Sequence, residues 1–502
     1  MKADVDAKRM PLPGEQAALL QHHDEDAQET HPMQELPTSI GHEAMRLLTL
    51  TTPQAFSLLM DIFPTLINLA LVGHMEVPQV DTLVDAVALS SMYVNVTAMA
   101  AILGLAKALD VLCSQSLLTT GSTKAFGAYL QSALLGMLMV LAPILVLNVF
   151  ARDVLVFLNQ DPAIAEKAGR FTQYTAIGLP FLAVFELLKK LLLVQDITTP
   201  TTYMVLASNV VHAVVGYLLT AYVPSLGFCG AAIARAIACA CLPLFLVPHY
   251  LLRRNAYHGW GLQWNIDDAT SSLRRFFHFG VPDVLSCMIE YGIFELLILL
   301  SGLMPNATVV LGANAVLINT FAVLNMICLA ISMATTSRVG DLLTAYKPHQ
   351  AQTAATAAFV VTLTTALLAI ACLYFGQNTL PAAFTSDVAI QERAGRAMVA
   401  VIPLYVVCAC TSVVQGVLWA VDKQDIANYI NAGGYYVVGI PLAAIFGFTL
   451  NWSIEGLWTG LAAGATLNLL VYLWFICGLN WKLMAKRASE RFASHKEQQY
   501  LF

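Results

Sequence analysis

Two carboxylic acids occupy matching positions in apolar segments that lie half a chain apart. Asp61 follows Pro53 by eight residues in TTPQAFSLLMDIFPTLINLALVGH, and Glu290 follows Pro282 by eight residues in GVPDVLSCMIEYGIFELLILLSG. An ionised carboxylate is costly in hydrocarbon, so acids within membrane segments usually face a cavity and often carry protons or cations. The two positions therefore predict proton-binding or cation-binding groups, and their repetition indicates a duplicated transporter.

Composition places the elements that hold these acids in a membrane. The chain is 58% hydrophobic and 12% charged, with a mean hydropathy of +0.68, outside the range of soluble domains. Apolar runs of about 20 residues, long enough to span a bilayer, alternate with short polar gaps. They predict an all-α polytopic membrane protein with twelve transmembrane helices, at residues 47–72, 83–113, 125–150, 168–194, 201–222, 228–252, 273–303, 311–338, 351–376, 396–421, 426–449 and 454–478.

The order of the helices indicates two halves with the same orientation. The longest polar interruption, at 253–272, has six predicted helices on either side. Pro53 and Pro282 differ by 229 positions, and Gly230 and Gly456 differ by 226, a nearly constant offset that is typical of parallel internal repeats. The predicted divisions are a disordered cytoplasmic tail at 1–41, an N-terminal lobe at 42–252, a cytoplasmic loop at 253–272, a C-terminal lobe at 273–480 and a cytoplasmic tail at 481–502.

The distribution of Lys and Arg predicts how the chain is oriented. With both termini in the cytoplasm, thirteen basic residues outside the N-terminal tail fall on the cytoplasmic side and five on the other, which agrees with the positive-inside bias. The expected location is the plasma membrane or a vacuolar or vesicular membrane. The sequence has no basic stripe with interleaved aromatic residues, so no nucleic-acid partner is expected. Membrane lipid is the expected surrounding partner. The expected functional unit is a monomer.

Motifs spread over the predicted helices carry a family resemblance. They include LINLALVGH at 66–74, GLAKALDVLCSQ at 104–115, LGFCGAAIA at 226–234, CMIEYGIFELLILLSGLMPN at 287–306 and QGVLWAVDKQ at 415–424. These segments resemble the multidrug and toxic compound extrusion (MATE) transporters, particularly their eukaryotic branch. The resemblance implies two six-helix lobes arranged as a V around a central cavity. It also implies exchange between inward-open and outward-open states.

The resemblance further assigns individual residues. Glu290 matches the essential carboxylate of eukaryotic members, and Glu295 matches a second acid of the same motif. Prokaryotic members commonly have an Asp where this chain has Asn68, and Asp61 lies about two turns away on nearly the same face. The acid that many eukaryotic members carry in helix 10 is absent here. Coupling is therefore expected to depend on Glu290, while Asp61 is either a coupling group or a structural acid that stabilises helix packing.

Polar and aromatic side chains within the helices are candidates for the cavity wall. Amides and hydroxyls there either bind substrate or join helices by hydrogen bonds. Aromatic rings either contact a cation or mark the membrane interface. The candidates are Gln54, Asn68, Asn95, Tyr291, Phe294, Glu295, Asn319, Ser412, Trp419, Tyr435 and Tyr436.

The expected activity is secondary active antiport, in which organic cations or other xenobiotics and metabolites leave while protons, or sodium ions, enter. A proton and a cationic substrate would compete for one negative charge, because burial disfavours an uncompensated carboxylate. The alternative is a flippase for lipid or lipid-linked oligosaccharide, which is expected to need several cationic residues for phosphate. An enzyme of the prenyltransferase kind would need clustered carboxylates, and only Asp422 and Asp425 come close. Neither an enzyme activity nor a metal site or cofactor is predicted.

Overall fold

The structure is a computed structural model that describes residues 39–500 apart from 76, 78–79, 121–122, 196, 198, 224, 253–264 and 422. The described residues form helices and turns, without a strand. The predicted tail at 1–41 lies almost entirely outside them, although α2 already begins at Ile40 with Ser39 as its cap. The side-chain oxygen of Ser39 accepts a hydrogen bond from the backbone N–H of His42 at 3.2 Å, which satisfies one of the free donors of the first turn.

Within the described residues, ten helices are long and apolar enough to span a membrane, and the bent α12 adds an eleventh span. α7 (Pro162–Ala176) and α8 (Leu179–Leu193) are each too short, yet together they occupy the predicted span at 168–194. Counted as one span, this pair brings the eleven spans to the twelve that the sequence predicted. The spans are formed by α2 (Ile40–Gly73), α3 (Val80–Val94), η1 (Asn95–Met99), α4 (Ala100–Thr120), α5 (Phe126–Val149), α9 (Thr199–Tyr222), α10 (Cys229–Leu252), α12 (Leu273–Ser301), α13 (Ala307–Thr344), α14 (Pro348–Gly376), α15 (Val388–Ala420), α16 (Gln424–Ala432), η4 (Gly433–Gly439), α17 (Ile440–Ala444), η5 (Ile445–Thr449) and α18 (Ser453–Cys477).

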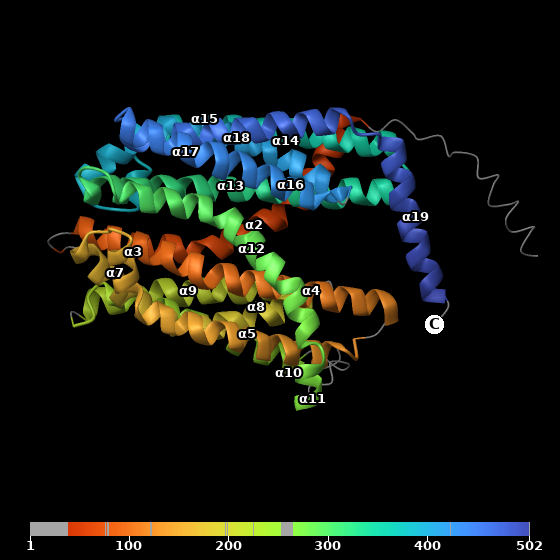
Figure 1. Ribbon diagram of the computed structural model, residues 1–502, viewed down its shortest axis with the longest axis horizontal. Helices are drawn as coiled ribbons and strands as arrows, with labels where there is room; N and C mark the ends of the chain where they lie inside the picture. The colour runs from red at the N-terminus through yellow and green to blue at the C-terminus, as the bar shows by residue number, and fades with distance from the viewer. Residues whose placement is uncertain are drawn as a thin grey trace, which may run out of the picture.

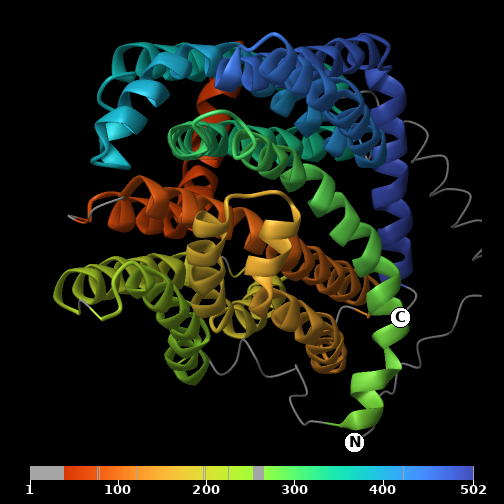
Figure 2. The same ribbon diagram turned by 60° about the vertical axis from the view of Figure 1, so that its left-hand side comes forward.

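The spanning helices form two bundles that diverge from one end, as Figure 1 shows. The first bundle holds α3 to α10 and the second holds α13 to α18. α2 and α12 run obliquely between them (Figure 2). Short helices complete the chain: α6 (Ala151–Phe157), α11 (Ile266–Ser271), η3 (Pro381–Ala383) and α19 (Trp481–Tyr500).

α2 packs on both bundles. Leu47, in its first half, is fully buried in one cluster with Ile331 of α13 and Ala358 of α14. Val72, near its end, is fully buried in another cluster with Val87 of α3. The first half of this helix therefore packs with the second bundle, although its sequence belongs to the first half of the chain.

α12 repeats this arrangement in the opposite sense. In its first half, Val284 lies so close to Gly104 of α4 that a Cβ on the glycine would collide with its backbone. In its second half, Leu297 is fully buried in one cluster with Val316 of α13. Each crossing helix thus begins against one bundle and ends against the other.

A buried ion pair fastens the first half of α2 to α13. The guanidinium of Arg338 donates two hydrogen bonds to Glu43, of 2.8 and 2.9 Å, and the Glu43 side chain has no exposed surface. Such a bidentate pair is sensitive to loss of one partner, because the other is then left charged and buried.

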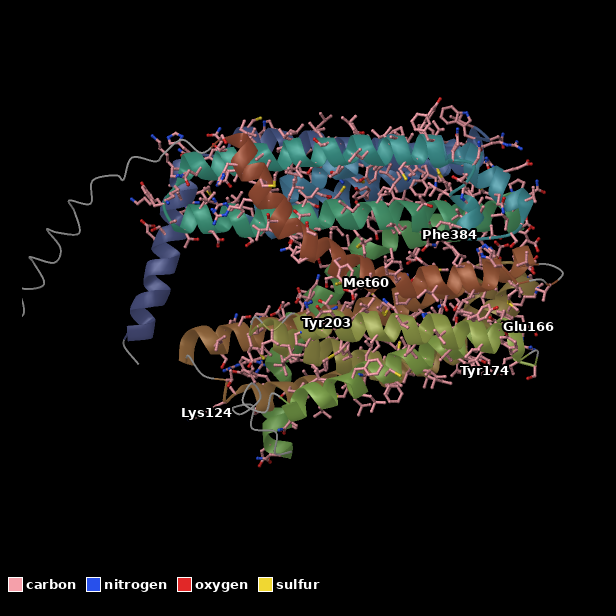
Figure 3. All side chains as sticks on the ribbon, turned by 180° about the vertical axis from the view of Figure 1, so that it is seen from behind. Met60, Lys124, Glu166, Tyr174, Tyr203 and Phe384 are labelled. Carbon is pink, nitrogen blue, oxygen red and sulfur yellow. The ribbon has the colours of Figure 1, made fainter. Side chains whose placement is uncertain are left out.

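The bundles touch directly at the end where α2 and α12 finish, called the distal end below. The backbone N–H of Ser386 donates to the carbonyl oxygen of Gly73 at 2.7 Å, and a ring nitrogen of His74 lies 3.1 Å from the carbonyl oxygen of Ala382. Gly73 is needed here because a Cβ would collide with the backbone of Phe384. Figure 3 labels Phe384 at this contact, Glu166 at the same end and Lys124 at the opposite one.

Candidate functional site

α12 is interrupted at the predicted coupling residue. Its segments Leu273–Ile289 and Gly292–Ser301 meet at 41°, and Glu290 and Tyr291 occupy the break. The structure describes the backbone of Glu290 and Tyr291 but not their side chains. Their predicted roles therefore stay predictions. What the fold contributes is a change of helix direction at this point of the motif.

A tyrosine from the second bundle contacts this break. The hydroxyl of Tyr436, in η4, donates to the carbonyl oxygen of Ile289 at 2.9 Å and lies 3.3 Å from that of Met288. The hydroxyl thus ties η4 of the second bundle to the backbone of α12 just before the break. A Cβ at Gly292 would stand 2.6 Å from the same hydroxyl, so a larger residue at this position would displace the Tyr436 side chain.

Glu295 lies on the next turns of α12 and faces the first bundle. Its Oε1 accepts a 2.7 Å hydrogen bond from the side-chain amide of Asn95, and the residue is 8% exposed. Oε2 is buried and has no hydrogen-bond partner among the described residues. Asn95 opens η1, a π-helical turn between α3 and α4, and such widened turns often occur at functional sites.

Further polar groups surround η1. The amide of Asn148, in α5, donates to Thr97 at 3.3 Å and to the carbonyl of Ile144 at 2.8 Å. Thr97 in turn donates to the carbonyl of Tyr93 at 2.7 Å. The buried Oδ1 of Asn148 has no partner among the described residues. Glu295 therefore faces a polar wall of the first bundle.

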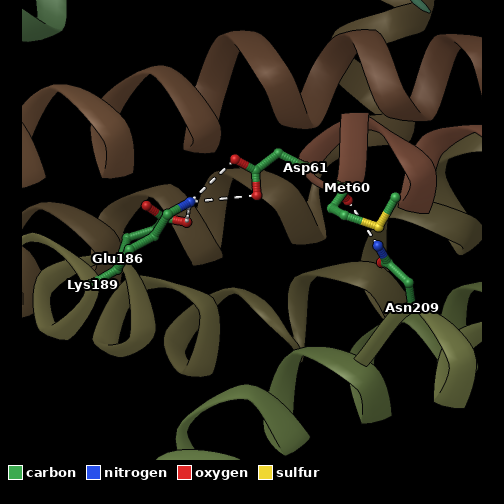
Figure 4. Close-up of polar contacts among 5 residues, drawn as sticks. All are labelled: Met60, Asp61, Glu186, Lys189 and Asn209. Atoms are coloured by element: carbon green, nitrogen blue, oxygen red, sulfur yellow. Dashed lines mark hydrogen bonds and ion pairs between the residues drawn. The ribbon is translucent and has the colours of Figure 1, made fainter. Parts of the chain in front are cut away.

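Asp61, expected to be either a coupling group or a structural acid, pairs with a lysine of α8. Its carboxylate lies 3.2 and 3.4 Å from Nζ of Lys189 in α8, and Glu186 lies 3.7 Å from the same nitrogen (Figure 4). The side chain of Asp61 is 41% exposed and that of Lys189 is 23% exposed. This is a partly exposed ion pair within the first bundle, and it involves two acids and one lysine.

A second pair lies one residue further along α8. Lys190 approaches Asp110 of α4 at 3.9 Å. Asp61, Glu186, Lys189, Lys190 and Asp110 together form what is called the charged row below. Its two lysines are each placed against acids.

Several predicted cavity residues bond within or between helices. Asn68 is buried and its Oδ1 lies 3.0 Å from Nε2 of the fully buried His212 in α9. Asn319 donates to the carbonyl of Ala315 on its own helix at 2.8 Å, and Ser412 likewise donates within α15 at 2.9 Å. Only the contact of Asn68 with His212 joins two helices, as the helix-packing alternative for such residues requires.

The remaining predicted residues divide between aromatic packing and unpaired polar atoms. Phe294 packs on Phe321 with ring centroids 5.2 Å apart, and the Tyr435 hydroxyl lies 3.4 Å from the sulfur of Cys408. Oε1 of Gln54 and Nε1 of Trp419 are buried without a hydrogen-bond partner among the described residues.

Sequence reasoning missed three groups that the fold buries or pairs. Glu186 of α8 joins the ion pair of Asp61, and His212 of α9 contacts Asn68. Asp85 is fully buried in α3, although the predicted helix start at 83 placed it in a terminal turn. An acid in an apolar run so close to a predicted end was the available signal. No group of three or more potential metal ligands occurs among the described residues.

The chain matches a family model in both halves. The MatE model covers residues 53–218 and 282–445, more than half of the chain. The matched segments begin at Pro53 and Pro282, the two prolines that mark the repeat in the sequence.

Related proteins match over nearly the whole chain. Multidrug and toxin extrusion protein 1 of Rattus norvegicus is 30% identical over 472 residues, which cover 92% of this chain and 80% of that protein. Protein DETOXIFICATION 10 of Arabidopsis thaliana is 29% identical over 468 residues, which cover 92% and 93%.

Solved structures share the fold. The eukaryotic MATE transporter AtDTX14 superposes with a TM-score of 0.73 at 24% identity, covering 90% of this chain and 99% of that one. A multidrug resistance MATE family transporter in an inward-facing conformation superposes with a TM-score of 0.72 at 13% identity, covering 89% and 99%. The predicted family and the V-shaped all-helical fold are thus confirmed, and this chain belongs to the MatE family of multidrug and toxin extrusion transporters.

Proposed function

We propose that the protein is a secondary active antiporter that exports small organic cations in exchange for protons by alternating access. The observation that carries this proposal is Glu295, a buried carboxyl with one oxygen on Asn95 and the other without a partner among the described residues. It lies on α12 five residues after Glu290, at the junction of the two bundles.

The chemistry required is competition for negative charge. A buried carboxylate is unfavourable unless a proton, a cation or several donors compensate it. Oε2 of Glu295 can therefore hold a proton or face a cationic group, but not both. Glu290 is proposed as the principal coupling acid on its motif match, and Glu295 as the acid that shares substrate contact.

The energetic yield of such an exchange follows from its stoichiometry. One proton exchanged for one monovalent cation moves no net charge, so the pH gradient alone drives it. One pH unit corresponds to about 1.4 kcal/mol, or about tenfold accumulation.

The arrangement of the bundles supports an inward-open state. Contacts at the distal end, such as Ser386 with Gly73, close that side. We propose that the distal end faces the exterior or an organelle lumen and that both termini are cytoplasmic. Asn306 and Asn451, which carry the two glycosylation sequons, are exposed at distal turns and fit this orientation.

The moving units are proposed to be the two bundles, which make up the lobes at 42–252 and 273–480 apart from the crossing helices α2 and α12. The protein is proposed to act as a monomer in the plasma membrane or a vacuolar or vesicular membrane. The loop at 253–272 joins the lobes, and the tails at 1–41 and 481–502 lie in the cytoplasm. Because Arg338 holds Glu43, the first half of α2 is expected to move with the second lobe.

The charged row argues against transport of lipid phosphates. Its lysines, Lys189 and Lys190, are placed against acids at 3.2 and 3.9 Å. A phosphate would have to displace those carboxylates, so the flippase is not proposed.

The test is efflux of a fluorescent organic cation from proteoliposomes with an imposed pH gradient, with and without sodium. An inward proton gradient should drive efflux, and collapse of the gradient by a protonophore should stop it. Efflux driven only by a sodium gradient would replace the proton in the proposal, and no gradient-driven efflux would reject antiport.

A further inference from the structure

Asp85 is a buried acid outside the site described above. It lies in α3, near the distal end, and has no exposed surface. Neither oxygen of its carboxyl group has a hydrogen-bond partner among the described residues. Gly312 of α13 lies against the carboxyl group, but its backbone N–H does not reach either oxygen with hydrogen-bond geometry.

The position of Asp85 makes it part of the contact between the bundles. A Cβ on Gly312, in α13, would stand 3.0 Å from Oδ1 of Asp85 and 2.8 Å from the side chain of Ile390 in α15. α13 and α15 belong to the second bundle, whereas α3 belongs to the first. The carboxyl group is therefore sealed from water by the closure of the two bundles on each other.

The charges around Asp85 do not compensate an ionised carboxylate. The nearest acids are Asp81, one turn earlier on α3, and Asp387, the cap of α15. Lys167 of α7 is the nearest cation, and its Nζ donates to Thr82 at 2.6 Å.

The other elements packed on α3 bring two further titratable groups. His74, at the end of α2, contacts backbone carbonyls, and Glu295 of α12 lies further along, opposite Asn95. An isolated charge at Asp85 would face a free-energy cost of several kcal/mol in this setting. The protonated acid is the form that suits the closed interface.

We propose that Asp85 is a proton-binding site that controls closure of the distal end. The acid is protonated while α3 contacts α13, and it loses the proton to water when the bundles separate there. The closed state then holds one more proton than the open state, so a lower pH on the distal side favours closure and a higher pH favours opening. This pH-dependent closure rests on the alternating access proposed above, but Asp85 is separate from the coupling acids of α12.

Closure can be measured without transport. Thr385 is fully buried at the distal contact, beside Gly73. In a background without reactive native cysteines, Thr385→Cys should react with a membrane-impermeant maleimide only when the distal end opens. Labelling of the native Asp85 protein is compared with that of Asp85→Asn at each pH, so that ionisation of the thiol cancels.

The expected result is a labelling ratio that rises with pH. Asp85→Asn carries no charge and should remain mostly closed, whereas the protein with Asp85 should open by up to about tenfold more per pH unit, the limit for one proton. Asp81→Asn is the matched control, since Asp81 lies on the same helix and is only half-buried. This control should keep the pH response.

Three results would overturn the proposal. The first is a pH response that survives Asp85→Asn. The second is labelling that follows sodium at constant pH. The third is loss of folding in both Asp85→Asn and Asp85→Ala, which would mean that an ionised carboxylate supports the fold. If the pH response depends on Asp85 but efflux shows no proton coupling, the role of Asp85 in closure is retained and the antiport assignment fails.

Discussion

The side-chain amide of Asn95 donates a 2.7 Å hydrogen bond to Oε1 of Glu295, and so joins the π-helical turn of the first bundle to the second half of α12. The bond fixes one oxygen of the acid and leaves the other to a proton or a substrate. Under the antiport proposed above, this contact is where a change in the protonation of Glu295 would reach the first bundle.

Glu295→Gln tests this contact. The amide oxygen of glutamine can still accept from Asn95, so folding should be retained, while the loss of the titratable oxygen should lower gradient-driven efflux at least about tenfold, as for a lost charged interaction of about 1.4 kcal/mol. Glu392→Gln is the control, because Glu392 forms an exposed surface pair with Arg396. Equal efflux by the two variants would remove Glu295 from the mechanism.

Glu290→Gln is predicted to abolish gradient-driven efflux and leave expression nearly unchanged. The prediction rests on the match of Glu290 to the motif and on its position in the break of α12. Substrate-binding assays with the purified variant would separate loss of coupling from loss of binding. Efflux at the native rate would exclude Glu290 as the coupling acid.

Asp61→Asn should slow transport without eliminating it. Lys189 keeps Glu186 as a partner in this variant, whereas Lys189→Met leaves two acids near each other and should be the more harmful change. Since Asp61 is partly exposed, the coupling energy of the pair in a double-mutant cycle should be about 1 kcal/mol or less. A variant Asp61→Asn without any activity on several cations would instead assign it a coupling role.

Tyr436→Phe removes the donor to Ile289 and should destabilise the protein by about 0.5–1.5 kcal/mol, as for one hydrogen bond. Gly292→Ala should be worse, because its Cβ would meet the Tyr436 hydroxyl. Combining the two removes that oxygen, so the double variant should recover part of the melting temperature lost by Gly292→Ala. Strictly additive losses would show that the hydroxyl does not shape the break.

Arg338→Met should destabilise the protein by about 3–5 kcal/mol, because it leaves Glu43 buried and unpaired. Adding Glu43→Gln removes the stranded charge and should restore part of this stability. Thermal unfolding in detergent measures both changes. If the double variant melts no higher than Arg338→Met, the charge of Glu43 is not the cause.

The helices, the repeat and the family could all be predicted from the order of the residues. Hydrophobic runs of bilayer length are local properties, so the eleven spans found in the described part of the chain, and the α7–α8 pair, lie where composition predicted them. Pro53 and Pro282 marked the halves for the same reason, since a repeat is visible in one dimension. The motif around Glu290 and Glu295 can likewise be recognised without knowing which residues are in contact.

Which of these acids have partners became visible only in the folded chain. Asp61 meets Lys189 from 128 positions away, and Asn95 meets Glu295 from 200 positions away. Asp85 is sealed because Gly312 of the other bundle lies against it. The physical reason is that an acid's protonation depends on the dielectric surroundings and charges within a few ångströms, and those are set by packing between distant segments, which hydropathy along the chain does not encode.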